Sequence, residues 1–572
     1  MAMTKHGTFV AVLVAAMALA IFGTTPPAPQ GADIPSSSFS AARAMADVRV
    51  VASTPHPTGS AENAAVRAHL IRRMQSMGME VTTSAGMIDE RGTAKYARWN
   101  GRNDPPKPLV NLIGILPGKD RTLPAVMLMS HHDTVWGSPG AADDTAGLAA
   151  SLEVVRAVSA QGEPQRDLMV LITDGEELGL QGARQFFASH PLREKIGAIV
   201  NLEARGGGGR STMFQTSAGN GAAMALFADN VPRPAASSLA AYIYSVLPND
   251  TDLTPALKGP YAAYNFAFIG RPGLYHSPLS TPDRLDQGAL QDMGDQVLGL
   301  TRGLLVAKQL PAPAQDAVFF DLFGLLLVIY PAWLGWIMLL VATSGFALAL
   351  RQNGRAGVAA GVGRMSGLIV TAGVLLYAFN WLSLGAGPPN YYDRLAAIPL
   401  LEVQAGLVLM AVYMFTLGRQ RAAPGTVVGA ALPLLLIALA GQALAPTAAY
   451  FIVVPIMLTG LVMAARGHMP ARAGTALIAA NAVTVTGFML ALGHQVMQGV
   501  GPTMPMAAVL PFSLAVVTLL PLWRGLAQRT ARITGICLLL MAGGVALWVQ
   551  LDPVADSVPA YAEPRFDAKR PR

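Results

Sequence analysis

Short apolar runs recur between residues 79 and 202, and each ends in a polar or glycine-rich turn. Runs of about five to seven apolar residues with such endings are typical of buried strands. We expect strands near 79–83, 109–116, 124–130, 167–173 and 197–202, and helices near 145–160 and 180–189. Alternating strands and helices predict an α/β domain, to which we assign residues 39–312.

The apolar segments that begin at residue 322 are much longer. Eight of them approach or exceed the roughly 20 residues that a helix needs to cross a bilayer. They lie near 322–348, 367–387, 396–417, 425–444, 447–465, 473–493, 503–522 and 533–550. They predict an all-α, polytopic membrane domain over residues 318–550, with the lipid bilayer as its partner and a tail at 551–572.

A further apolar run, FVAVLVAAMALAIF at 9–22, follows Lys5. Its length fits either a membrane anchor or the core of a signal peptide. The TTPPAPQ stretch after it lacks a clean small-x-small cleavage site, which favours an uncleaved anchor. Residues 24–38 are rich in proline, serine and threonine and are predicted to be a linker.

Arginines gather in every second loop between the long apolar segments. They are Arg351, Arg355, Arg364, Arg419, Arg421, Arg466, Arg472, Arg524, Arg529 and Arg532, whereas the intervening loops contain Arg394 alone. The positive-inside rule places the arginine-bearing loops in the cytoplasm and residues 24–320 outside it. Lys5 gives the same orientation, although the basic residues of the tail fit it poorly. Abundant alanine, glycine and arginine with little lysine favour a bacterial source, and hence the periplasmic face of an inner membrane over a eukaryotic lumen.

Composition excludes some classes of protein. With 52% hydrophobic and 13% charged residues, the chain is too apolar to be a purely soluble protein. Its net charge of +7 comes without a basic patch interleaved with aromatic residues, so we expect no nucleic-acid partner. The single cysteine, Cys537, rules out an intrachain disulfide.

Acidic and imidazole residues follow several of the predicted strands. They are His131 and Asp133 in HHD, Asp143 in GAADD, Glu176 and Glu177 in DGEEL, Glu203 in NLE and His276 in LYHS. The carboxyl ends of such strands converge on one crevice, and nitrogen and oxygen ligands suit zinc first. Taken singly, each residue is more often a helix cap, a solvated acid or a structural histidine. Their joint placement is harder to explain without a metal.

The remaining candidates stay open or structural at this stage. Asp133, Asp144 and Asp252 fit either a helix cap or an outer partner of a ligand. The other histidines of this half, which are His56, His69, His132 and His190, are interpreted as structural.

In the order H-x-D, GAxDD, EE, NLE and YH, the chain resembles the di-zinc aminopeptidase family of metallopeptidases (peptidase M28-type). The resemblance is to the membrane branch that contains vacuolar membrane protease and endoplasmic-reticulum metallopeptidase, and it covers about residues 39–310. FFDLFG at 319–324 and NLEARGGGGR at 201–210 also resemble that branch. The resemblance implies an α/β zinc-exopeptidase domain with a mixed central sheet flanked by helices, two Zn²⁺ ions per chain and peptide substrates.

The resemblance also implies a role for each residue. His131 and Glu203 would hold one zinc, Glu177 and His276 the other, and Asp143 would bridge them. Glu176 would be the general base, Asp133 the partner of His131, and Tyr275 a donor to the developing oxyanion. Many soluble members of the family have aspartate at the position of Glu203, whereas the NLE motif fits the membrane branch.

Other readings remain. The spacings of twelve residues from His131 to Asp143 and 73 from Glu203 to His276 argue against a related di-zinc carboxypeptidase with an inserted lid. A non-catalytic relative that binds partners, a single-zinc aminoacyl cyclase and a transporter with an appended domain are the alternatives. For a transporter, only Glu402 lies clearly inside a predicted span.

Overall fold

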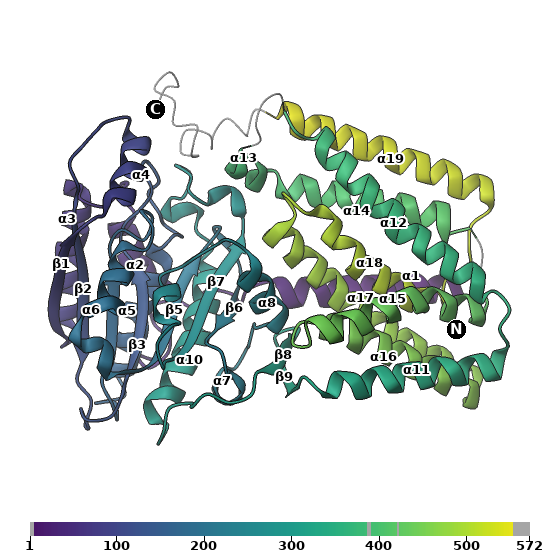
Figure 1. Ribbon diagram of the computed structural model, residues 1–572, viewed down its shortest axis with the longest axis horizontal. Helices are drawn as coiled ribbons and strands as arrows, with labels where there is room; N and C mark the ends of the chain where they lie inside the picture. Colours follow the sequence, from purple (N-terminus) through teal and green to yellow (C-terminus); the bar gives the residue numbers. More distant parts are fainter. Residues whose placement is uncertain (1–4, 386–389, 420–421, 553–572) are drawn as a thin grey trace. The chain divides into compact units, whose positions relative to one another are not determined.

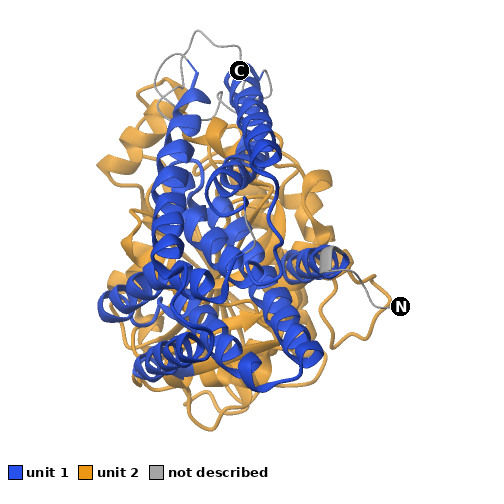
Figure 2. Ribbon diagram, turned by 90° about the vertical axis from the view of Figure 1, so that its right-hand side faces the viewer, with its two compact units in different colours: residues 1–24, 330–389, 397–552 blue, residues 25–329, 390–396, 553–572 orange. Residues whose placement is uncertain are grey.

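The computed structural model describes residues 5–385, 390–419 and 422–552. It forms two compact units, which Figure 2 distinguishes by colour. Unit 1 comprises residues 1–24, 330–389 and 397–552, and unit 2 comprises residues 25–329, 390–396 and 553–572. Arg421 and most of the predicted tail lie outside the described residues.

Unit 2 is built on a seven-stranded sheet with the order β1-β2-β4-β3-β5-β7-β6 (Figure 1). Its strands are β1 (Glu80–Met87), β2 (Pro108–Leu116), β3 (Ala125–His131), β4 (Leu168–Thr173), β5 (Ile196–Ala204), β6 (Gly208–Thr216) and β7 (Ala262–Gly270). The four central strands β4, β3, β5 and β7 are parallel, and the outer pairings are antiparallel. This confirms the predicted mixed sheet, and it adds β6 and β7, which the apolar runs did not indicate.

Helices cover both faces of this sheet. The helices of unit 2 are α2 (Ala41–Val51), α3 (Ala61–Ser76), α4 (Glu90–Asn100), α5 (Thr145–Ser159), α6 (Gln181–Ser189), α7 (Gly221–Asn230), α8 (Ser238–Val246), α9 (Leu253–Ala256), α10 (Gln287–Val306) and α13 (Tyr391–Ala396). Along β3, Val126 and Leu128 pack into the core that α2, α5 and α10 share. Met127 and Met129 point the other way, into the core with α6 and α9. A central strand buried on both faces explains why β3 is apolar at every position from 125 to 129.

From Thr25 onward, the predicted linker at 24–38 is an ordered part of unit 2. Gln30 donates its backbone N–H to Gln291 on α10 at 3.0 Å. Arg43 donates to the carbonyl oxygens of Ala32 and Ile34, and Arg156 donates to that of Ser36. The guanidinium groups thus satisfy backbone acceptors that a free linker would leave to water.

A β-hairpin replaces the start of the first long apolar segment. Strands β8 (Ala317–Leu322) and β9 (Leu326–Pro331) pair with each other, and α11 begins only at Leu334. Phe323 and Gly324 have φ angles of 55° and 70°, and Asp321 accepts the N–H of Gly324. Two consecutive left-handed residues are incompatible with an α-helix and typical of a tight hairpin turn. The expectation of a helix from residue 322 is therefore wrong.

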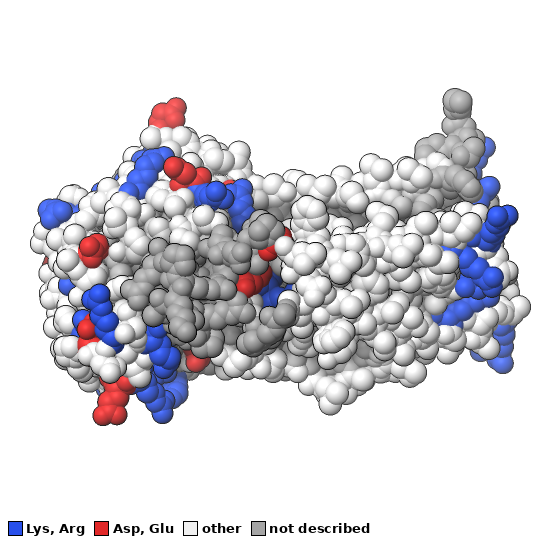
Figure 3. Space-filling view, turned by 90° about the horizontal axis from the view of Figure 1, so that it is seen from above, with Lys and Arg blue, Asp and Glu red and all other residues white. Residues whose placement is uncertain are grey.

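Beyond the end of β9, every regular element in the described residues of unit 1 is a helix. Its helices are α1 (Lys5–Thr24), α11 (Leu334–Asn353), α12 (Val358–Leu382), α14 (Ile398–Thr416), α15 (Pro424–Leu444), α16 (Tyr450–Ala465), α17 (Ala471–Val500), α18 (Val509–Leu519) and α19 (Gln528–Leu551). Among the described residues, eight helices, namely all of these except α18, are long and apolar enough to cross a membrane. On the face that Figure 3 shows, Lys and Arg side chains gather at one end of unit 1 and are sparse over its helices.

The segment predicted at 503–522 is the exception. Its α-helix spans only Val509–Leu519, which is about 17 Å at 1.5 Å per residue. Pro505 starts a short 3₁₀ turn before it, and Pro521 follows its end. The eight helices that are long enough to cross a membrane are therefore α1 and the seven long helices after residue 330.

Small residues let the helices of unit 1 approach closely. A Cβ atom on Gly345 of α11 would lie 2.6 Å from the backbone of Gly460 on α16. A Cβ atom on Gly429 of α15 would lie still closer to the carbonyl oxygen of Val358 on α12. Helix α1 packs on α17 through buried Val12, Ala16 and Ala20, with Gly487 facing Ala16. Such contacts are typical of packed membrane helices.

Candidate metal centre

The parallel strands of unit 2 bring acidic and imidazole side chains to one edge of the sheet. His131 ends β3, and Glu203 is the penultimate residue of β5. Glu176 and Glu177 follow β4, and His276 follows β7. Because β4, β3, β5 and β7 are neighbours in that order, their carboxyl ends form one crevice.

Asp143 lies between the two histidines. Its Oδ1 is 3.1 Å from Nε2 of His131, and its Oδ2 is 3.1 Å from Nε2 of His276. Asp143 stands in the turn that leads into α5, one residue before the helix cap. A carboxylate that offers one oxygen to each of two imidazoles has the arrangement of a ligand shared between two ions.

A second carboxylate accompanies each histidine. Oε1 of Glu177 is 3.0 Å from Nε2 of His276, and Oε2 of Glu203 is 3.9 Å from Nε2 of His131. Ligand atoms of His131, Asp143 and Glu177 all lie within 4.8 Å of one another. The structure thus brings together all five residues that were predicted as ligands, and their division between two ions stays a prediction.

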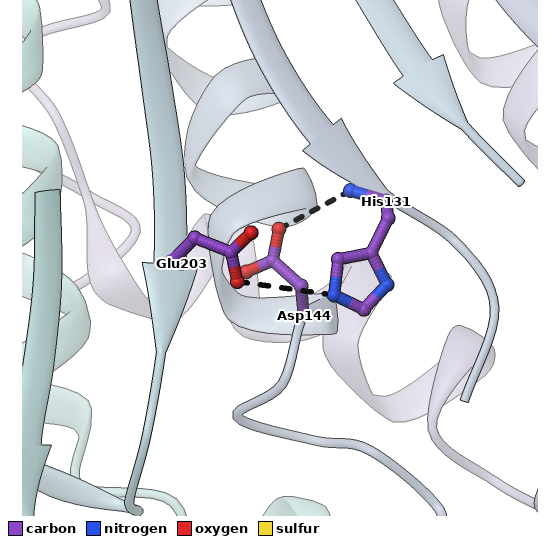
Figure 4. Close-up of side chains that lie close together, drawn as sticks. All are labelled: His131, Asp144 and Glu203. Carbon is purple, nitrogen blue, oxygen red and sulfur yellow. Dashed lines mark hydrogen bonds and ion pairs between the residues drawn. The ribbon is translucent and has the colours of Figure 1, made fainter. Parts of the chain in front are cut away.

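Asp144 contributes a further carboxylate beside His131 and Glu203 (Figure 4). Its Oδ2 accepts the backbone N–H of His131 at 3.3 Å, and its Oδ1 accepts the N–H of Gly147 at 3.2 Å. The second bond caps the first turn of α5. Asp144 is therefore a helix cap that also ties α5 to the end of β3.

Asp133 holds the turn that carries the two glutamates. Its carboxylate accepts the N–H of Glu176 at 3.1 Å and the N–H of Glu177 at 3.2 Å. Its Oδ1 is 3.5 Å from Nδ1 of His131, whereas the Asp133 carbonyl oxygen is closer to that nitrogen, at 3.0 Å. Both oxygens favour a proton on Nδ1, which leaves Nε2 free to bind a metal.

Glu176 and Tyr275 stand at the rim of the cluster. Glu176 is partly exposed, whereas its neighbour Glu177 is buried. The Tyr275 ring stacks on His276 with centroids 3.8 Å apart. His276 itself has a φ of 51°, a left-handed backbone that directs its ring toward the acids.

The cluster contains more carboxylates than imidazoles, and most of these groups are buried. Burial raises the pKa values of Glu176 and Glu203 well above the usual range of a glutamate. The charge of His131 lowers these pKa values, and neighbouring carboxylates raise them further. Burial alone lowers the pKa of His131, but hydrogen bonds to Asp133 and Asp143 raise it well above its usual value. Buried acids that compete for so few bases favour the binding of added positive charge.

The donor set fits zinc. Within the described residues, Glu203 Oε1 is buried without a hydrogen-bond partner, and Glu177 Oε1 and His276 Nε2 lie 3.0 Å apart without forming a well-aligned hydrogen bond. Such atoms are costly unless something binds them, and carboxylate and imidazole ligands are those that zinc takes in catalytic sites. The residues therefore fit a zinc centre with Asp143 in its middle.

Two residues near the centre were missed or left open by sequence reasoning. Asp252 does not cap α9 through its side chain; it accepts the Thr173 hydroxyl at the end of β4, and burial raises the pKa of Asp252 to about 7. Tyr392 lies 116 residues after His276 and contacts its ring at Nδ1. Nothing in the local sequence around Tyr392 indicates this contact.

The remaining histidines of unit 2 bind other parts of the fold. His132 faces Asn63 and the carbonyl oxygen of Val110, and burial lowers its pKa to about 4. His56 bonds to the Thr54 carbonyl and His69 to Asp47. Their hydrogen bonds agree with the structural interpretation.

Unit 1 contains a polar cluster of its own. Glu402 on α14 lies 3.0 Å from Nδ1 of His494 and accepts a hydrogen bond from Gln498, both on α17. The prediction that Glu402 is the one ionisable group within a span missed His494, because α17 continues to Val500. Among the described residues, the Glu402–His494 contact thus joins α14 to α17.

Known proteins resemble the chain in this region. Residues 111–301 match the family described as Peptidase family M28. The chain is 30% identical over 302 residues to endoplasmic reticulum metallopeptidase 1 of Rattus norvegicus, with 50% of this chain and 34% of the relative covered. It is 29% identical over 301 residues to vacuolar membrane protease of Yarrowia lipolytica, with 50% and 30% covered. The chain thus spans about a third of the length of these relatives.

A solved aminopeptidase from Aneurinibacillus sp. strain AM-1 aligns over 49% of this chain and 99% of its own, at 15% identity and a TM-score of 0.38. The matched family segment runs from β2 into α10 and includes His131, Asp143, Glu177, Glu203 and His276. It confirms the resemblance that the motifs indicated. Residues 111–301 are therefore similar to a domain of peptidase family M28.

Proposed function

We propose that this chain is a membrane-integral zinc aminopeptidase. The observation that carries the proposal is the position of Asp143, with one carboxylate oxygen 3.1 Å from each of two histidines. Glu203 beside His131 and Glu177 beside His276 complete two ligand sets that share Asp143. A structural role for Asp143 alone would not require this symmetry.

Each residue has a definite task in this proposal. His131 and Glu203 hold one zinc, His276 and Glu177 hold the second, and Asp143 is shared. Zinc, when bound, supplies Lewis-acid activation of water and of the scissile carbonyl. Glu176 takes the proton of the attacking water and delivers it to the leaving amine. Tyr275 donates a hydrogen bond to the developing oxyanion.

The surplus of acids supports cleavage from the amino end of a peptide. A free α-amine is a cation, and Glu176 and Glu203 lie where they would accept its protons. A blocked amine is neutral and would offer these carboxylates no cation. The proposed substrates are therefore peptides with a free amino terminus.

The test of this proposal measures zinc and hydrolysis together. The detergent-purified chain is expected to contain two zinc ions by elemental analysis and to release p-nitroaniline from aminoacyl-p-nitroanilides. A strong chelator should abolish the release, and added zinc should restore it. N-acetylated versions of the same substrates are the matched control and should be resistant.

Other results would sink the proposal in different ways. One zinc per chain with cyclisation of an amino-terminal glutamine would indicate the cyclase alternative. Absence of both metal and hydrolysis after reconstitution with zinc would indicate a partner-binding domain.

We further propose that residues 25–329 face away from the cytoplasm, as the arginine-bearing loops favour. A cysteine at exposed Thr83 in a Cys537→Ala background should react with an impermeant maleimide in intact cells. A cysteine at exposed Ala356, between α11 and α12, should react only after permeabilisation. The reversed pattern would place the site in the cytoplasm.

A further inference from the structure

A short segment between two long helices of unit 1 folds as part of unit 2. Residues 390–396 connect to α12 on one side and α14 on the other, yet they cluster with the sheet domain. They include the single-turn helix α13, whose main neighbour in unit 2 is the 3₁₀ turn Pro272–Leu274. That turn directly precedes Tyr275 and His276.

Three contacts attach this segment to the metal centre. The Tyr392 hydroxyl is 2.8 Å from Nδ1 of His276. Arg205, two residues after Glu203, donates from Nε to the Tyr391 hydroxyl at 2.9 Å. A Cβ atom on Gly273 would lie 3.0 Å from Cα of Ala396, so the two backbones are in close contact.

The contact with His276 has a chemical consequence. Its Nε2 faces Asp143 and Glu177, so a metal would bind there and the ring proton would reside on Nδ1. That N–H then donates to the Tyr392 hydroxyl. A partner on the far nitrogen fixes the tautomer and the ring orientation of a metal-binding histidine.

The course of the chain allows this arrangement. Helices α11 and α12 separate the end of β9 from the 383–397 connection. If both cross the membrane, as their lengths and composition indicate, the connection emerges on the side where the sheet domain lies. It also carries Arg394 alone, which agrees with the arginine-poor side.

We propose that Tyr392 is a positioning residue for His276, and that residues 390–396 complete the metal centre from within the membrane half of the chain. This inference rests on the proposed zinc peptidase function. It gives the membrane half a part in metal binding beyond anchoring: it supplies the outer partner of one zinc ligand. The Tyr391–Arg205 pair and the Gly273–Ala396 contact hold that partner in place.

The test compares full-length Tyr392→Phe with wild type and with Tyr242→Phe, which alters an exposed tyrosine of the same unit. Loss of the hydroxyl is expected to weaken one of the two zinc sites by about 10- to 100-fold, measured by competition with a chromogenic chelator. The cobalt-substituted protein should show an altered visible absorption band in Tyr392→Phe alone. An unchanged thermal midpoint confirms that the fold is intact.

Gly273→Ala tests the same contact without removing a hydroxyl. The added methyl group presses on Ala396 and should also weaken zinc binding. In the double variant the two effects should be less than additive, because both act through the position of Tyr392. Fully additive losses of zinc affinity would contradict a common effect through the position of Tyr392.

The outcomes separate this inference from the proposal beneath it. Two zinc ions in wild type and equal zinc affinity and cobalt spectra in Tyr392→Phe would overturn the role of Tyr392 alone. A wild-type chain that binds no zinc would overturn the proposed function and this inference with it.

Discussion

Replacement of Glu176 by glutamine is expected to lower kcat by about 10²- to 10⁴-fold, the usual contribution of a general base. The amide keeps the size of the side chain but has no basic oxygen to accept a proton from water. Zinc content should stay at the wild-type value, because Glu176 lies at the rim of the cluster and its neighbour Glu177 faces His276. KM should change little.

Rates with an aminoacyl-p-nitroanilide and elemental analysis of the same preparation check this expectation. Glu163→Gln is the matched control, since Glu163 is exposed in the loop before β4 and should behave as wild type. Glu177→Gln is the informative neighbour and should lose metal. Loss of zinc in Glu176→Gln, with retention in Glu177→Gln, would show that the roles of the two glutamates are exchanged.

Replacement of Asp143 by asparagine is expected to weaken both zinc sites together. The amide has one oxygen and no charge, so it serves one ion at most, and its NH₂ group would face the other histidine. Loss of an outer partner alone weakens metal binding by about 10- to 100-fold, and loss of a shared ligand should exceed that. Hydrolysis should fall below detection at ordinary zinc concentrations.

The adjacent residue provides the control. Asp144→Asn keeps an oxygen for the N–H of Gly147 and loses only the longer 3.3 Å bond from the His131 N–H, and asparagine caps helices as well as aspartate does. It should therefore retain both zinc ions and most of the activity. If Asp144→Asn lost metal as Asp143→Asn does, Asp144 would be a ligand, as its position beside His131 and Glu203 allows.

The metal centre could be located from the sequence because its residues stand next to patterns that are recognisable locally. Each predicted ligand from His131 to Glu203 stands at the end of an apolar run or in the turn before a helix. Strand ends can be recognised locally, and parallel strands bring their ends together without further information. His276 follows β7, a strand that the pattern did not indicate, and was found through the YH motif and the resemblance.

The same local reasoning failed where an apolar run can adopt more than one secondary structure. The stretch from Phe319 to Pro331 is apolar enough to suggest a helix, but the turn at Phe323 and Gly324 makes it a hairpin. The run at 503–522 is long enough for a span, but its prolines limit the helix to Val509–Leu519. Hydropathy indicates that a segment is buried, whereas the backbone geometry decides whether it folds as a hairpin, a short helix or a long helix.

The sequence by itself thus determined the class of both halves, the strand-end positions of the acids and the metal that suits them. Only the tertiary structure decided that Asp143 meets both histidines, that Asp133 holds the glutamate turn, and that Tyr392 reaches His276. Apolar periodicity and turn residues act between near neighbours along the chain. A hydrogen bond between residues 116 positions apart depends on how the whole chain packs, and no local pattern records it.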